Sequence, residues 1–166
     1  MSLKVSLIEE DSQLVRQIHS IIKVTPVITA GAYSANDIVG GNLTISNAGR
    51  RPAVGGLIKT LTVIDKAKQN AELNFLFFSA LAGTYLDNAA EAISVADGLS
   101  CLGIDSILAT DYKNMANFSI ASIFVGLEGI PFSVVTRDLK LLVRTPGTPT
   151  YVSTSDLLFV FGVVRN

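Results

Sequence analysis

The sequence predicts an all-β, mainly antiparallel protein: a single-domain β-sandwich or jelly-roll-like body with about one short helix. Apolar residues make up 49% of the 166 positions, yet they are spread over short runs rather than long ones. Several runs alternate apolar and polar side chains, the period of a half-buried strand. Turn residues separate the runs, and nine or ten short strands at this spacing are typical of a sandwich or jelly roll rather than a parallel βαβ sheet.

The first 25 residues are expected to form an N-terminal strand or arm, and residues 26–166 the β-sandwich body. Alternation at the start of the chain predicts a strand over residues 3–8, followed by an acidic turn at 9–11. Residues 14–24 fit either a helical face or a strand. Their β-branched side chains and the following Pro26 favour the strand.

The first half of the body reads as strands separated by turn-rich loops. Loops are expected over residues 33–41 and 47–56, around a short strand at 42–46, because Gly, Asn, Ser and Pro cluster there. Two longer strands follow at 57–65 and 73–79. The short polar connection at residues 66–71 predicts that they form a hairpin.

One helix is expected, within residues 84–103. Ser94 and Asp97 have the spacing of a capping box, and Val95 and Leu99 recur at helical spacing. Beyond it, the pattern predicts strands over residues 104–109, 117–125, 132–135, 138–144 and 157–165.

Charge is scarce, and this limits the kinds of partner. Charged residues make up 16% of the chain, against a usual share of about 25%. A net charge of -1 offers no basic field to hold a nucleic acid. The longest apolar run, residues 157–164, is far shorter than the roughly 20 residues that span a bilayer. Neither nucleic acid nor membrane is therefore an expected partner, and part of the surface is expected to be covered by copies of the chain or by another protein.

Few residues in the sequence suggest catalysis. His19 is the sole imidazole and Cys101 the sole thiol, so neither a triad nor a zinc shell can be assembled around them. The pairs Gly40-Gly41 and Gly55-Gly56 lack phosphate-loop spacing and are interpreted as turn glycines. We expect no enzyme, no cofactor and no metal.

The acidic side chains of the body are expected to build turns. Each lies in a predicted turn or strand end, where a carboxylate accepts hydrogen bonds from nearby backbone N–H groups. The acids interpreted in this way are Asp37, Asp65, Asp87, Asp111 and Asp156.

Four stretches resemble, in the same order, a family of small structural proteins of tailed bacteriophages. They are PVITAGAYSANDIVGG (26–41), DKAKQ (65–69), ATDY (109–112) and TPTYVSTSDL (148–157). The resemblance implies a virion component of the head decoration or cement class. Such proteins are typically β-rich, form homotrimers and bridge subunits of the major capsid protein. It also implies a location in the phage head, after synthesis in the cytoplasm of the bacterial host.

Two functions stay open. The first is a non-enzymatic capsid decoration protein, and the alternative is a receptor- or glycan-binding module of a tail or fibre. For the alternative, Tyr33, Tyr112 and Tyr151 are stacking candidates, or else anchors at strand ends. For the first, the N-terminal strand would pair with its own sheet or with a neighbouring subunit. The dibasic loop would meet an acidic partner, or else carry solvated charges. The candidate contacts between subunits are Leu3, Val5, Leu7, Ile8, Arg50 and Arg51.

Overall fold

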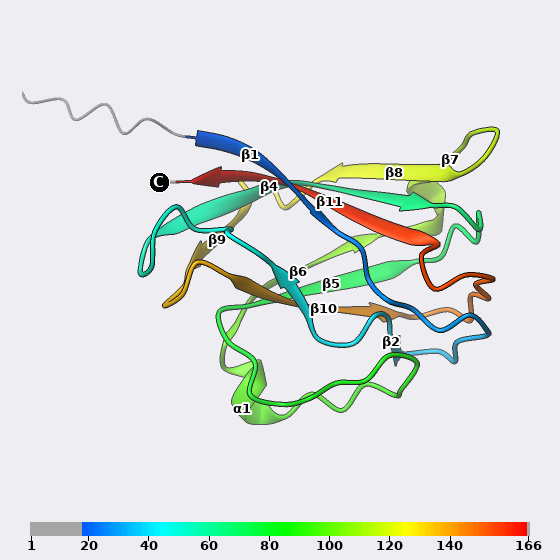
Figure 1. Cartoon of the computed structure of the whole chain (residues 1–166), viewed down its shortest axis with the longest axis horizontal. Helices are drawn as coiled ribbons and strands as arrows, with labels where there is room; N and C mark the ends of the chain where they lie inside the picture. Colours follow the sequence, from blue (N-terminus) through cyan, green and yellow to red (C-terminus); the bar gives the residue numbers. More distant parts are fainter. Residues whose placement is uncertain (1–17, 166) are drawn as a thin grey trace, which may run out of the picture.

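The computed structural model describes residues 18–165, which form two β-sheets packed face to face (Figure 1). None of the helical segments in this part of the chain is long and apolar enough to cross a membrane. Sheet A contains β1 (Ile18–Val24), β4 (Gly55–Asp65), β7 (Lys113–Asn114), β8 (Ser119–Phe124), β9 (Ile130–Ser133) and β11 (Leu157–Arg165). Sheet B contains β2 (Asp37–Ile38), β3 (Leu43–Ile45), β5 (Leu73–Phe78), β6 (Cys101–Ile107) and β10 (Leu139–Thr145). The helical elements are α1 (Val95–Gly98) and the 3-10 turn η1 (Ala109–Asp111). The all-β prediction is confirmed.

The strand order is that of a jelly roll. Sheet A runs β1-β11-β4-β8-β7, with β9 also paired to β4, and sheet B runs β2-β10-β5-β6, with β3 also paired to β10. Every pair is antiparallel. The strands pair from the ends of the chain inward: β1 with β11, β3 with β10, β4 with β8, and β5 with β6. The described chain is thus one long nested hairpin rolled into two sheets.

The predicted hairpin between residues 57–65 and 73–79 is wrong. The first strand is β4 of sheet A and the second is β5 of sheet B, and residues 66–72 cross from one sheet to the other. Burial explains the separation. β4 alternates between buried and half-buried residues, whereas all six residues of β5 are buried. A strand that is apolar on both faces needs cover on both sides, which β5 finds in sheet B.

The main core lies between the sheets and is centred on aromatic side chains. Phe75 of β5 packs edge-on against Phe159 and Phe161 of β11, with ring centroids 5.1 and 6.4 Å away. Phe77 meets Phe161 in the same way at 6.0 Å. All four rings are fully buried. These edge-to-face contacts connect the two sheets at their middle.

A second, smaller core lies on the outer face of sheet B. Leu76, Phe78 and Leu142 point outward from β5 and β10, and they are covered by Leu81, Tyr85, Ile93 and Cys101. Most of this cover comes from residues 79–100, which lie below β5 and β10 in Figure 1 and include α1. Sheet B therefore has its outer face covered by its own chain over β5 and β10, while Ile104 of β6, opposite Leu76, is 60% exposed.

The predicted helix is mostly irregular chain. α1 has four residues, and Val95 and Leu99, the expected helical face, are 84% and 85% exposed. The predicted N-cap is present, since Ser94 Oγ accepts from the backbone N–H of Asp97. The Asp97 carboxylate has further hydrogen-bond partners outside the cap. It accepts from the N–H groups of Ala82 and Gly83 and from the Tyr85 hydroxyl, at 2.7, 3.0 and 2.6 Å.

Asp97 thereby ties residues 79–100 to one another, and we expect Asp97→Asn to loosen the cover that they form on sheet B. The Tyr85 hydroxyl, followed by the Ala82 N–H, lowers the pKa of Asp97. A carboxyl with a lowered folded pKa adds stability above its ordinary pKa of about 4, and this is lost as the pH falls. Thermal unfolding should therefore show a lower midpoint for Asp97→Asn at neutral pH and a smaller further drop on acidification. Glu72→Gln is the control, because that carboxylate accepts no hydrogen bond within residues 18–165; an equal response from both variants would contradict the role given to Asp97.

Acidic side chains build the loops, as predicted from their positions. Asp37, Asp65, Asp111 and Asp156 each accept from a backbone N–H three to five residues away. Asp87 acts at longer range. It accepts from Thr29 N–H and Oγ1, the Tyr33 hydroxyl and Gly40 N–H, and so ties residues 79–94 to the segment after β1. These acidic side chains are therefore engaged in hydrogen bonds within the fold.

The remaining strand expectations have mixed outcomes. Residues 18–24 form β1, so the strand interpretation of 14–24 is confirmed over these residues. Residues 14–17 and the strand expected over residues 3–8 lie outside the described residues. Gly55 and Gly56 are the first residues of β4, not turn residues. The loop expected at 33–41 contains the two-residue β2.

Candidate assembly surface

On the outer face of sheet A, residues that are paired across neighbouring strands form rows, and each row mixes apolar and polar side chains. In one row, Lys23 of β1 is followed across the sheet by Val160, Thr62 and Ser122. The Thr62 and Ser122 hydroxyls lie 2.8 Å apart and form a hydrogen bond. The neighbouring row carries Ile21, Gly162, Thr60 and Phe124. Ile21 and Phe124 are 75% and 82% exposed, so this row presents two large apolar groups to solvent.

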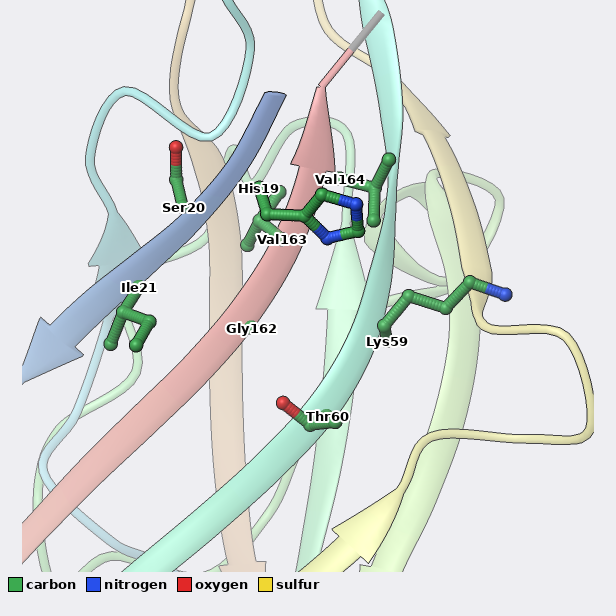
Figure 2. A pocket seen from close by; sticks show the side chains of 8 residues that line it. All are labelled: His19, Ser20, Ile21, Lys59, Thr60, Gly162, Val163 and Val164. Atoms are coloured by element: carbon green, nitrogen blue, oxygen red, sulfur yellow. The ribbon is translucent and has the colours of Figure 1, made fainter. Parts of the chain in front are cut away.

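A hollow of about 300 Å³ lies at Gly162, between β1 and β4 (Figure 2). The sheet has a register shift between Gly162 and Val163, a β-bulge that bends the strand here. A Cβ atom at position 162 would collide with Thr60 Oγ1. Glycine is therefore needed at this crossing, and its missing side chain leaves the sheet surface concave.

A second hollow of about 400 Å³ adjoins the first and shares His19, Lys59 and Val164 with it. Its far wall is Phe124 and the fully exposed Leu127, in the turn between β8 and β9. Gly129 closes this turn with φ +95°, and a Cβ atom there would lie 2.7 Å from the Ile58 carbonyl oxygen. Together the two hollows form one shallow groove. We call it the sheet A groove, lined by His19, Ser20, Ile21, Lys59, Thr60, Phe124, Val125, Gly126, Leu127, Gly129, Gly162, Val163 and Val164.

Charged groups of both signs lie at the groove. Lys59 lines it and Lys23 lies beside it, while Glu128 lies in the turn of its far wall and Asp105 Oδ2 accepts from the N–H of Gly126, a lining residue. Lys59 Nζ donates to the carbonyl oxygen of Glu128, not to a carboxylate. His19 and Ser20 are consecutive residues of a strand, so their side chains point to opposite faces and cannot act together as base and nucleophile. The chemistry this lining offers is burial of apolar groups.

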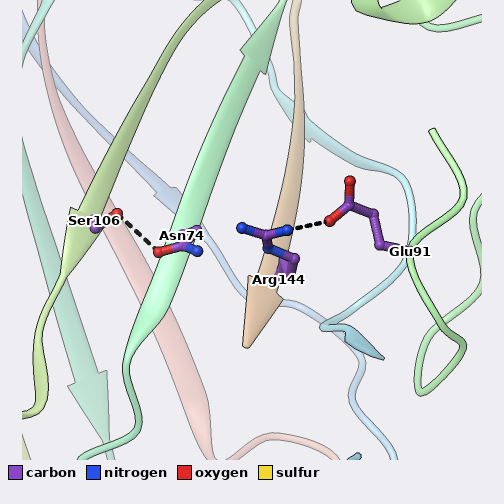
Figure 3. Close-up of polar contacts among 4 residues, drawn as sticks. All are labelled: Asn74, Glu91, Ser106 and Arg144. Carbon is purple, nitrogen blue, oxygen red and sulfur yellow. Dashed lines mark hydrogen bonds and ion pairs between the residues drawn. The ribbon is translucent and has the colours of Figure 1, made fainter. Parts of the chain in front are cut away.

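The outer face of sheet B differs in being tied down by polar contacts (Figure 3). Ser106 Oγ donates to Asn74 Oδ1 at 2.8 Å, and Arg144, next to Asn74 across the sheet, pairs with Glu91 at 2.6 Å. Glu91 belongs to the segment that covers this sheet. Apolar packing and an ion pair thus cover sheet B over β5 and β10, whereas within residues 18–165 no segment covers the outer face of sheet A.

The edge of sheet A is also open. β1 pairs with β11 along all seven residues without a register shift, and within residues 18–165 it has no strand on its other side. Edge strands usually carry proline, a bulge or charges that discourage further pairing. β1 has a regular register and lacks proline, and Lys23 and His19 are its only charged or titratable residues.

The three tyrosines proposed for stacking are anchors of the fold. Tyr33, Tyr112 and Tyr151 are 2%, 7% and 1% exposed, and Tyr33 packs edge-on against Tyr151 with centroids 5.8 Å apart. Their rings are therefore not accessible to a glycan or a receptor. Their burial fits anchors of the fold, but only Tyr112 lies at a strand end, directly before β7, while Tyr33 and Tyr151 lie in loops.

The other residues singled out from the sequence lie apart from the groove or outside the described chain. Arg50 and Arg51 are exposed in the loop between β3 and β4 and do not line the groove. Cys101 is a free, half-buried thiol packed on the second core. Leu3, Val5, Leu7 and Ile8 lie outside the described residues.

The groove residues themselves were not predicted. Ile21, Phe124, Leu127 and Gly162 look like core or turn residues in the sequence. A usable signal was the pair Ile120 and Phe124, which are outward positions on the same face of β8 and are apolar where a solvated strand would be polar.

Comparisons with known proteins add no family to this picture. No protein-family model matches the sequence, and no curated protein matches it.

Proposed function

We propose that this chain is a non-enzymatic structural protein of a bacteriophage head, a decoration or cement protein that bridges subunits of the major capsid protein. It would be made in the cytoplasm of the bacterial host, assemble as a homotrimer and end in the virion. The observation that carries the proposal is the open outer face of sheet A, with exposed Ile21, Phe124 and Leu127 around a shallow groove.

Three further points support it. The sequence resembles small structural proteins of tailed phages over four ordered stretches. The jelly roll is a recurrent fold of viral capsid proteins, although it also serves in lectins and other classes. Contiguous exposed apolar groups on a protein surface commonly mark an interaction site.

The groove gives a direct test of this function. We expect Phe124→Asp combined with Leu127→Asp to weaken binding to phage heads that lack the protein by about thirtyfold, the effect of losing about 2 kcal/mol of contact. Both side chains are exposed, so the variant should fold. Binding is measured by co-sedimentation of labelled protein with the heads.

Val95→Asp combined with Leu99→Asp is the matched control. These residues are as exposed as Phe124, but they lie on α1, on the sheet B side. Binding lost in the α1 variant and kept in the groove variant would contradict the assignment of the surface. Labelling of intact particles tests the location: many copies over the head are expected, and a few copies confined to the tail would refute the decoration role.

A further inference from the structure

Two neighbouring loops at one end of the sandwich carry three exposed arginines. Arg50 and Arg51 lie in residues 46–54, between β3 and β4, and Arg137 lies in residues 134–138, between β9 and β10. We infer that these three residues, called here the arginine end, form a docking surface for an acidic patch of a partner protein. The inference rests on the proposed function and names the chemistry of the surface that the chain meets in the head.

Backbone hydrogen bonds hold the two loops together. The N–H of Gly49 donates to the Arg137 carbonyl oxygen at 2.9 Å, and the N–H of Ala53 donates to the Val134 carbonyl oxygen at 3.0 Å. Both loops lie at the left end of the sandwich in Figure 1, and β7 lies at the right end. The backbone that carries the arginines is therefore already arranged before a partner binds, which lowers the ordering cost of association.

The positive charge of this end is not balanced by acidic side chains of the described chain. None of the three arginines forms an ion pair within residues 18–165. Asp138 is the one acidic residue of the two loops, and its carboxylate accepts from the N–H of Asn47 at 2.8 Å. Arg165, opposite Gly56 in the sheet, adds a fourth cation at this end, and its buried Nε has no hydrogen-bond partner in the same part of the chain. A local excess of positive charge attracts an acidic surface.

The arginine end has the composition of a protein-binding surface rather than of a nucleic-acid site. Guanidinium groups form forked pairs with carboxylates, and arginine is enriched in protein interfaces. Apolar groups lie among the charges, because Val135 is 87% exposed and Pro52 and Ala53 are exposed as well. The two loops contain no aromatic residue on which a base could stack, and the chain as a whole has a net charge of -1.

A protein that bridges two subunits needs two contact surfaces, and the arginine end supplies one that is distinct from the sheet A groove. None of its arginines lines the groove. The groove offers burial of apolar groups, whereas the arginine end offers charge pairing. We therefore expect substitutions in the groove to act mainly on dissociation, and substitutions at the arginine end to act on association, which surface charges steer.

Association with phage heads that lack the protein tests this surface. We expect Arg50→Gln, Arg51→Gln and Arg137→Gln together to slow association with immobilised heads about tenfold at low salt. The dependence of the rate on salt should also become flatter, because screening then has less charge to act on. Lysine at the same three positions should restore the rate, since it keeps the charge.

The matched control removes the same amount of positive charge from the other end of the sandwich. It consists of three exposed lysines that follow β4 or lie in β7, changed to glutamine: Lys66→Gln, Lys68→Gln and Lys113→Gln. The control should associate with heads at the wild-type rate. An equal slowing in both variants would show that net charge and not the arginine end controls association, and it would overturn the inference.

Immobilised poly-L-glutamate is the second probe, because it tests the acid-binding chemistry without heads. The wild-type chain should be retained at low salt and should elute earlier once the three arginines are glutamine, while the lysine control elutes with the wild type. Retention on immobilised duplex DNA without retention on poly-L-glutamate would reassign the surface to nucleic acid and overturn the inference.

The two probes separate this inference from the proposed function. If the arginine variant associates with heads as fast as the wild type, the inference is overturned and the decoration role stands. If the wild type does not bind heads, but its retention on poly-L-glutamate depends on the arginines, the decoration role is refuted and the acid-binding surface is supported.

The acidic run of the chain itself, residues 9–11, is the competing partner for the arginines. Thermal unfolding distinguishes it from an external one. The arginine variant should unfold at the wild-type temperature, since its changes are confined to exposed side chains. A lower temperature that returns to the wild-type value when Glu9→Gln, Glu10→Gln and Asp11→Asn are present in both chains would mean that the arginines pair within the chain, and the inference would be wrong.

Discussion

Phe75→Ala is expected to lower the free energy of unfolding by about 4 kcal/mol. The ring of Phe75 is fully buried and meets both Phe159 and Phe161 edge-on, so the substitution removes apolar burial and opens a cavity where the sheets touch. Chemical denaturation at a fixed protein concentration measures the loss, since association would add to the apparent stability.

Phe124→Ala is the matched control for this variant. It removes the same side chain from a strand of sheet A, but from a position 82% exposed. Its effect should stay within about 0.5 kcal/mol. Equal losses for the two variants would mean that the inter-sheet aromatic cluster is not the centre of stability.

A steep loss of stability above about pH 10 is the second large effect. Burial raises the pKa values of Tyr33, Tyr112 and Tyr151 well above their ordinary range. A group with a raised folded pKa keeps its proton in the folded state, while the unfolded chain loses it. Stability is therefore full below the ordinary tyrosine pKa and falls as pH rises. Each tyrosine contributes a slope of about 1.4 kcal/mol per pH unit, and the three together about 4.

Tyr151→Phe tests the source of that slope. The Tyr151 hydroxyl is buried and has no hydrogen-bond partner within the described residues, so its removal should leave stability at neutral pH unchanged or slightly higher. The alkaline slope should fall by about a third. Denaturant unfolding across alkaline pH measures this, and tyrosinate absorbance follows the same protons without tryptophan interference. An unchanged slope would show that other groups, such as lysines, cause the alkaline loss.

Most strands of this fold could be predicted from the sequence, because alternation is a local signal. The pairing of the strands could not be predicted in this way, nor could which faces of the sheets are covered. The connection between β4 and β5 resembles a hairpin loop, and the partner of each strand is decided by segments far away in the chain. A local clue was present in β5, Leu73–Phe78, since a run with little alternation indicates burial on both faces. The helix was overestimated because the Ser94 cap is real but the residues after it pack on nothing.

The candidate surface was less predictable for a related reason. Low charge predicts that part of the surface is covered by a partner, but it does not predict which part. Which sheet face stays open depends on residues 79–100 lying on sheet B, where Glu91 pairs with Arg144 of β10. The position of this segment is decided by tertiary contacts and not by the local sequence. In the sequence, Ile21 and Phe124 look the same as core residues, and Gly162 looks like an interruption in an apolar run.

The place of β11 in sheet A has a consequence for timing during synthesis. β11 lies between β1 and β4, so the first-made strand of the described chain gains its only sheet partner from the last-made one. During translation, β1 cannot pair with β11 until the rest of the chain is made. Sheet A is therefore complete only after residue 165 leaves the ribosome. Non-local pairing of this kind slows folding. It also means that a nascent chain does not yet present the completed edge and groove, which would delay association between copies until each one is finished.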